Sequence, residues 1–242
     1  MKNPLILILA ILIGTSSAFA QYSGGNGTSG NPWQIANTND LIALSNTSAD
    51  WGDHFIQTAN ITFDSDETQV DWDGDDILEH PGDDAPGFSP IGNSLTNFTG
   101  SYDGQGYEIS NLFIDRPSTD NVALFGRTNG STIENLCVVD CDISGEDQVG
   151  GLVGWNENSS SIENSYSTGA VDGSGNSVGG LVGYNLSSST INNSYSTGAV
   201  SSSGSSVGGL VGYNLSSSSI DNSYSSGAVS SMWFPSRWSC GV

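Results

Sequence analysis

Apolar residues recur along this chain with a spacing of 29 residues. The recurring positions are Ile133, Ile162, Ile191 and Ile220; Val149, Val178 and Val207; and Leu152, Leu181 and Leu210. The valines and leucines lie in a repeated segment, V-G-G-L-V-G-x-N, in which x is Trp or Tyr. A fixed period of this length indicates a solenoid, in which each unit buries its apolar face against the units above and below it.

Two segments of each unit have the composition of β-strands. In one unit, the first runs from Val149 to Asn156 and the second from Ile162 to Val171. Stretches rich in Ser, Gly and Asn, such as 172–177, follow the strands and are typical of turns. The chain shows no sustained helical period of apolar residues, so helical repeats are excluded.

Strands that return once per unit, at about 4.8 Å per coil, pair in parallel with their counterparts in the next coil. We therefore predict an all-β parallel β-helix with an isoleucine ladder in its core. Glycines beside Leu152 and Val153 allow either side chain to point inward, and we favour Leu152. Two columns of asparagines are expected to hydrogen-bond from coil to coil: Asn135, Asn164, Asn193 and Asn222, and Asn156, Asn185 and Asn214.

The regular repeats occupy only part of the chain, residues 133–231. Less regular turn glycines and short apolar strands over 89–132 predict irregular coils of the same kind. Residues 21–63 are expected to form an N-terminal cap and the first strands, with a short capping helix beginning at Asn39-Asp40. Such a cap would cover the open end of the stack.

The repeated V-G-G-L-V-G-Y-N resembles the GLUG motif of bacterial secreted and surface proteins. Residues 98–112 resemble the segment that precedes these motifs, and the stretch from Gly24 to Leu41 is similar to their N-terminal boundary. The resemblance implies a right-handed β-helix in large adhesin-like proteins, and such repeats also accompany some bacterial immunoglobulin A1 proteases. None of the matched positions is a catalytic residue of the family.

The first twenty residues have the form of a signal peptide. Lys2 precedes an apolar run, and Ala18-Phe19-Ala20 has the small-x-small pattern that signal peptidase cuts. We predict cleavage after Ala20 and a secreted or cell-surface protein. The apolar run is too short for a membrane span, and the mature chain is expected to have no transmembrane segment.

The chain is strongly acidic, with a formal net charge of −22. A chain with this charge is not expected to bind nucleic acid, because the phosphates would repel it. Many of the carboxylates lie in a predicted loop insertion, residues 64–88, where Asp71, Asp73 and Asp75 could offer oxygens to calcium. The spacing does not match an EF-hand, and a flexible solvated loop is the alternative. The sequence otherwise predicts no cofactor.

Neither the cysteines nor the C-terminal segment fit a simple pattern. Cys137 and Cys141 would lie too far apart to bridge if their segment is extended, so we predict two buried thiols.

The period requires another V-G-G-L-V-G at Ser236, whereas 232–242 read M-W-F-P-S-R-W-S-C-G-V. A one-nucleotide shift of the reading frame permits the missing motif there. A frameshifted tail is one interpretation, and a divergent cap over the last coil is the other.

The residues favour a binding surface over an enzyme. No nucleophile, base and orienting partner occur together, and a β-helix lyase needs a basic residue that this chain hardly offers. Trp155, Tyr184 and Tyr213 are equally spaced and would form an aromatic file suited to a glycan, or to a surface protein of a host or neighbouring cell. The rings could equally pack only against one another. The alternative functions are a polysaccharide-active lyase or hydrolase, and a truncated fragment of a larger surface protein or protease with no function of its own.

Overall fold

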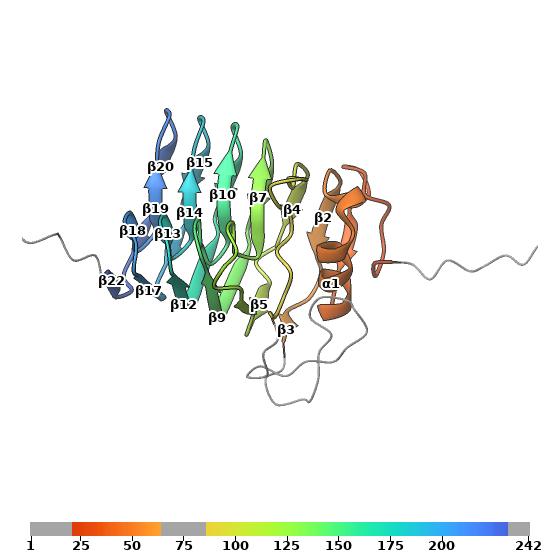
Figure 1. Cartoon of the computed structure of the whole chain (residues 1–242). Coiled ribbons are helices and arrows are strands. Elements are labelled where there is room, and N and C mark those ends of the chain that lie inside the picture. Colours follow the sequence, from red (N-terminus) through yellow and green to blue (C-terminus); the bar gives the residue numbers. More distant parts are fainter. Residues whose placement is uncertain (1–20, 64–85, 232–242) are drawn as a thin grey trace, which may run out of the picture.

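The computed structural model describes residues 21–63 and 86–231. It is a parallel β-solenoid of about 5 turns, with about 29 residues per turn and one α-helix near the N-terminus. Figure 1 shows the coils stacked along one axis, with the helix at the N-terminal end. The predicted all-β parallel β-helix is confirmed. The signal peptide, most of the acidic insertion and the segment 232–242 lie outside the described residues.

The first sheet runs the length of the stack and begins with two strands of the N-terminal segment. Its order is β1 (Trp33–Ile35), β2 (His54–Gln57), β4 (Ser101–Asp103), β8 (Thr132–Glu134), β11 (Ser161–Glu163), β15 (Thr190–Asn192) and β20 (Ser219–Asp221). All neighbours are parallel and in register, so Phe55, Tyr102 and Ile133 occupy one column. The isoleucine ladder is therefore continued by aromatic residues in the irregular coils.

Two further sheets carry the V-G-G-L-V-G segments. The larger one consists of β7 (Phe125–Asn129), β10 (Val153–Glu157), β14 (Val182–Asn185) and β19 (Val211–Asn214). The smaller one pairs β13 (Val178–Gly179) with β18 (Val207–Gly208). In these coils the segment is thus two short strands separated by a corner, rather than one strand.

The remaining sheet closes each coil. Its main order is β3 (Ile61–Thr62), β5 (Glu108–Ser110), β9 (Cys137–Gly145), β12 (Tyr166–Gly173), β16 (Tyr195–Ser196) and β21 (Tyr224–Ser225). Beside these strands pair β6 (Phe113–Asp115), β17 (Ala199–Ser202) and β22 (Val229–Ser231). Every pair of named strands in the described chain is parallel, as coil-upon-coil stacking requires.

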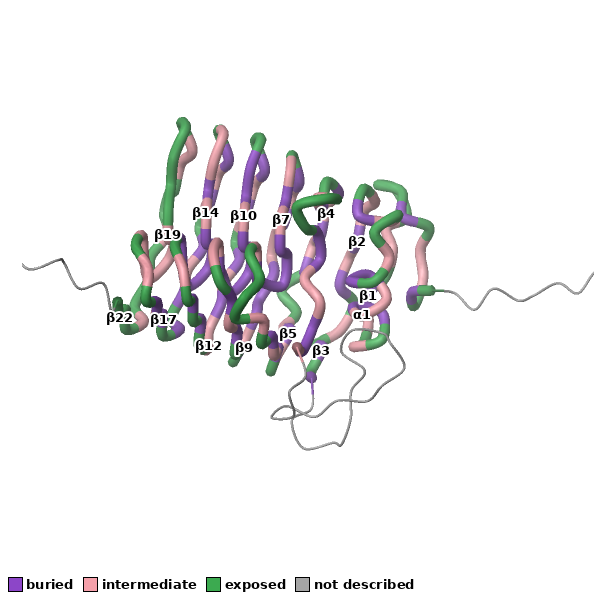
Figure 2. The backbone as a smooth tube through the Cα atoms, viewed as in Figure 1, coloured by how far each residue is buried: buried purple, intermediate pink, exposed green. Residues whose placement is uncertain are grey.

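The core is a set of aliphatic columns along the axis. Ile133, Ile162 and Ile191 are fully buried and in register. Leu152 was favoured over Val153 as the inward-pointing residue, but both are fully buried. The chain turns a corner there, so both side chains reach the core. Figure 2 shows buried residues through the middle coils and a largely exposed last coil around β19 and β22.

The strand predicted from Ile162 to Val171 is wrong as a single element. It divides into β11 and β12, because Asn164 adopts a left-handed conformation with φ of 49° and turns the chain. Asn135, Asn193 and Asn222 have the same conformation, which asparagine tolerates better than most residues. One pair of this column is bonded as predicted, since Asn164 Nδ2 donates to Asn135 Oδ1 at 3.3 Å.

The second asparagine column lies inside the stack. Asn156 Nδ2 donates to Asn185 Oδ1 at 2.8 Å, and Asn185 Nδ2 donates to Asn214 Oδ1 at 2.7 Å. Thr128 Oγ1 adds a donor to Asn156 Oδ1 at the N-terminal end. This amide ladder is the one predicted from the spacing, and it satisfies polar groups that would otherwise be buried without partners.

The predicted capping helix is present as α1 (Thr38–Asn46), followed by a 3₁₀ turn, η1 (Ser48–Asp50). Its N-cap is Asn37, whose side chain accepts from the backbone N–H of Asp40, so the helix begins earlier than Asn39-Asp40. Leu41 and Leu44 bury the inner face of the helix. The indole N–H of Trp51 donates to the Leu44 carbonyl at 2.8 Å, and this carbonyl also accepts from the backbone N–H of Thr47 at the end of the helix.

Cys137 and Cys141 are both free and buried, as predicted. The Cys141 thiol donates to the Thr168 carbonyl at 3.0 Å, and burial raises its pKa to about 12. Burial also raises the pKa of the Cys137 thiol. Both groups therefore stay protonated at neutral pH and are poor nucleophiles.

Candidate functional site

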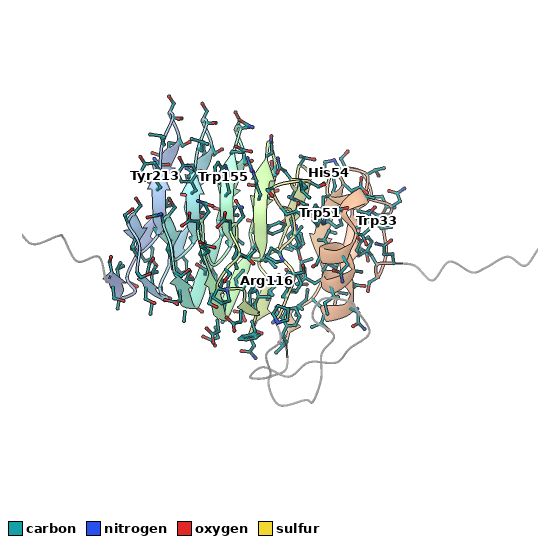
Figure 3. The ribbon with its side chains drawn as sticks, viewed as in Figure 1. Trp33, Trp51, His54, Arg116, Trp155 and Tyr213 are labelled. Carbon is teal, nitrogen blue, oxygen red and sulfur yellow. The ribbon has the colours of Figure 1, made fainter. Side chains whose placement is uncertain are left out.

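Trp155, Tyr184 and Tyr213 lie side by side on one flank of the solenoid. Parallel pairing of β10, β14 and β19 places them at one register position, and Figure 3 shows Trp155 and Tyr213 on the same side. The ring centroids of Trp155 and Tyr184 are 4.7 Å apart, and those of Tyr184 and Tyr213 are 5.2 Å apart. The structure thus brings together the three aromatic residues singled out from the sequence, which we call the aromatic file.

Arg127 ends the aromatic file on its N-terminal side. It occupies the equivalent position on β7, and its guanidinium carbon lies 4.5 Å from the centre of the Trp155 ring. Glu157 holds the guanidinium in a 2.8 Å ion pair and also accepts from the Trp155 indole N–H at 3.1 Å. One face of Trp155 is therefore covered, and the charge of Arg127 is paired.

A groove of about 410 Å³ runs beside the aromatic file. Each of three coils contributes one aromatic ring and polar residues from the preceding turn. The polar residues that line it are Asp147, Gln148, Asn176, Ser177 and Ser206. The groove therefore offers the same kind of surface, an aromatic rim beside a polar rim, in each of three coils.

The orientation of the rings limits what they can contact. The planes of Tyr184 and Tyr213 are only 2° from parallel, so these rings stack on each other along the solenoid axis. A ligand in the groove consequently meets ring edges and phenol hydroxyls more than ring faces. Tyr213 is the most accessible of the three, with 40% of its surface exposed.

Comparison with known families identifies the repeat. The family model described as the GLUG motif matches residues 145–172, 174–201 and 203–230. The repeats are GLUG motifs. Each matched segment of the GLUG repeats supplies one ring of the aromatic file, and the resemblance drawn from V-G-G-L-V-G-Y-N is confirmed.

Two curated proteins resemble the chain over about half of its length. Halomucin of Haloquadratum walsbyi is 35% identical over 133 residues, which make up 54% of this chain and 1% of Halomucin. A protein named "Putative Gly-rich membrane protein" of Evansella cellulosilytica is 32% identical over 111 residues, 46% of this chain and 11% of that protein. The chain thus spans a small fraction of the length of these relatives.

A solved structure shares the fold. The crystal structure of a putative immunoglobulin A1 protease from Bacteroides ovatus aligns with a TM-score of 0.52, over 87% of this chain and 70% of that chain. Sequence identity is 20%, so the similarity concerns the β-solenoid architecture alone.

The GLUG repeats carry a second aromatic column that the sequence analysis did not single out. Tyr166, Tyr195 and Tyr224 stack with centroid distances of 4.6 and 5.2 Å and planes within 9° of parallel. Burial, followed by the neighbouring Cys137 thiol, raises the pKa of Tyr166. The spacing of 29 residues that revealed the aromatic file was equally visible here. No groove residue belongs to this column, which makes it a matched reference for the aromatic file.

The expected calcium ligands Asp71, Asp73 and Asp75 lie outside the described residues. Within 21–63 and 86–231, no three His, Cys, Asp or Glu side chains are grouped so that they could hold a metal ion. His54 instead shares a 2.7 Å hydrogen bond with the Ser101 hydroxyl. In the same two ranges, no helix is long and apolar enough to cross a membrane.

A row of carboxylates on the first sheet yields a stability prediction. Asp103, Glu134 and Glu163 are in-register neighbours on the outer face. Burial, and then the charges of Asp103 and Glu163, raise the pKa of Glu134. Because the folded-state pKa lies above the unfolded-state value, ionisation of Glu134 lowers stability as the pH rises through these values.

Glu134→Gln should therefore raise the free energy of unfolding at neutral pH, by about 0.2–1 kcal/mol for like charges directly opposite in a sheet. Urea unfolding at neutral pH and near pH 3 measures the effect, which should vanish when the carboxylate is protonated. Asp221→Asn is the control, because its in-register neighbour is the uncharged Asn192. Equal gains from both substitutions would contradict the interpretation.

Proposed function

We propose that this chain is an exported, adhesin-like β-solenoid that binds glycans along the groove and catalyses no reaction. It would act at the cell surface or as a secreted protein, after removal of residues 1–20. The GLUG repeats and the solenoid fold support a surface β-helix protein. The observation that carries the proposal is the groove itself, which three coils line with both aromatic rings and polar side chains.

The two rims match the two kinds of surface on a sugar. A pyranose ring presents C–H groups, which can contact the exposed edges of the aromatic rings, and hydroxyls, which both donate and accept hydrogen bonds. Gln148 and Asn176 offer amide groups, and Tyr184 and Tyr213 offer phenol hydroxyls. Binding sites for small polar ligands commonly combine aromatic walls with a few such polar groups.

The same residues favour binding over hydrolysis. Glycosidases use two carboxyl groups placed on either side of the scissile bond. Among the described residues that line the groove, Asp147 is the one carboxylate, and one of its oxygens accepts from the backbone N–H of Asn176. Release of reducing sugar from a bound polysaccharide by the purified protein would favour the alternative, a polysaccharide-active enzyme.

Glycan-array binding followed by calorimetry tests the proposal. Tyr184→Ala removes the central ring and should weaken binding of an array hit by roughly tenfold or more, as expected when a central aromatic contact is lost. Tyr195→Ala is the matched control, since it removes a stacked tyrosine from the same coil but away from the groove. Binding that is lost equally in both variants, or in neither, would contradict a glycan site at the groove.

A further inference from the structure

We infer that the groove selects an uncharged, extended β-linked glycan that lies parallel to the solenoid axis, with one sugar against each coil. This inference rests on the proposed function and specifies its ligand. It follows from three features of the groove: its repeat along the axis, its unpaired polar groups and its charge.

The repeat of the groove matches that of an extended glycan. Consecutive coils are separated by the spacing of paired strands, about 4.8 Å. The ring spacings of 4.7 and 5.2 Å in the aromatic file follow this rise. A pyranose in a β-1,4-linked chain advances by a similar length, so each sugar would lie against one coil. A branched or compact ligand could not use this repetition.

Several polar groups that line the groove have no hydrogen-bond partner within the described chain. Within the described chain, the side-chain amide of Gln148 and the phenol hydroxyls of Tyr184 and Tyr213 make no hydrogen bond. The Asn176 amide accepts from Ser205 through Oδ1, which leaves its Nδ2 donor free. These groups face the groove from successive coils and are suited to the regularly spaced hydroxyls of a linear glycan.

The charge of the groove opposes acidic ligands. Asp147 is a lining residue, and the nearest cation of the aromatic file, Arg127, is already paired with Glu157. The whole chain carries a formal net charge of −22, so its field repels anions over the surface. Uronate-containing or sulfated glycans should therefore bind more weakly than uncharged ones of the same shape.

Within the described residues the aromatic file offers three rings. Arg127 covers Trp155 at one end, and the file continues through Tyr184 to Tyr213. A glycan that contacts all three rings spans three sugars. Affinity should therefore rise from the disaccharide to the trisaccharide.

Calorimetry on the full chain with cellobiose, cellotriose, cellotetraose and cellohexaose tests the inference, with manno-, xylo- and chito-oligosaccharides as parallel series. In the best-binding series, we expect the trisaccharide to bind roughly threefold to tenfold tighter than the disaccharide, the equivalent of one additional hydrogen-bonded sugar. Equal affinities for the disaccharide and the hexasaccharide would overturn the inference.

Charge is tested with trisaccharides of C6-oxidised cellulose, which keep the shape of cellotriose and add carboxylates. We expect these to bind at least about tenfold more weakly than cellotriose, with Asp147→Asn reducing the difference. A preference for the oxidised trisaccharide would overturn the inference. If an array yields Tyr184-dependent binding to a branched or acidic glycan, the proposed function stands and this inference falls; if no glycan binds at all, both fall.

Discussion

Ile162→Ala should lower the free energy of unfolding by about 2–5 kcal/mol, the range for deleting an aliphatic side chain from a packed core. Ile162 is 0% exposed and lies in register between Ile133 and Ile191. Because these neighbours are held by their own strands, the stack cannot collapse into the space, and a cavity remains. Urea unfolding followed by far-UV circular dichroism measures the loss.

Ile220→Ala provides the control for the isoleucine column. It makes the same chemical change in the same column, but Ile220 lies in the last described coil and is 36% exposed. The substitution leaves no enclosed cavity and should cost about 1 kcal/mol or less. Equal losses from the two variants would show that the internal ladder contributes no more than the end of the stack.

Asn185→Ala should lower the free energy of unfolding by about 2–4 kcal/mol. Asn185 is fully buried, accepts from Asn156 and donates to Asn214. Its removal leaves the Asn156 donor without its partner in a site closed to water, and each buried polar group so orphaned costs about 1–3 kcal/mol. Calorimetric or urea unfolding gives the difference from the parent chain.

Two variants identify the cause of the loss at Asn185. Asn185→Asp keeps the shape but replaces the donor by a buried carboxylate whose folded-state pKa is raised by desolvation. Its stability should recover as the pH falls, because the protonated acid is uncharged and can donate. Asn192→Ala, on the outer side of β15, should change stability by no more than about 0.5 kcal/mol. A pH-independent loss at Asn185→Asp would contradict the hydrogen-bonded ladder.

The register of the coils could be predicted because one spacing governs every layer of the structure. Equal spacing placed Ile133, Ile162 and Ile191 in one ladder, Asn156 and Asn185 in another, and the three rings of the aromatic file in a third. In a parallel solenoid, identical residues one period apart must meet, so the sequence determines neighbours without any knowledge of the path within a coil.

The path within a coil was harder to predict, since it depends on single backbone conformations. The turn at Asn164 depends on its left-handed φ. The spacing of apolar residues around Asn164 does not predict this conformation. At the V-G-G-L-V-G corner, a side chain on Gly151 would lie 2.6 Å from the Gly180 carbonyl of the next coil, and this close approach brings both Leu152 and Val153 into the core. Periodicity gives no information on either feature.

The groove was not predicted, although its aromatic rim was. Gln148 and Ser177 precede the V-G-G-L-V-G segment and have the composition of an ordinary turn. They face the aromatic file because the chain reverses between the turn and the strand, with left-handed φ values of 56° and 62° at these two residues. A linear pattern of residue types does not contain that reversal.

The in-register pairing of the coils has a consequence for the gene. Deleting residues 174–202 would join Gly173 to Ser203 and bring Ile162 against Ile220, Trp155 against Tyr213 and Asn156 against Asn214, the same classes of contact that the intact chain makes. Unequal recombination between the repeats could therefore shorten or lengthen the protein by whole coils without unfolding it. Variants that arise in this way would differ in the length of the groove but share its pitch and chemistry, so under the proposed function the copy number would set how many sugars the groove contacts.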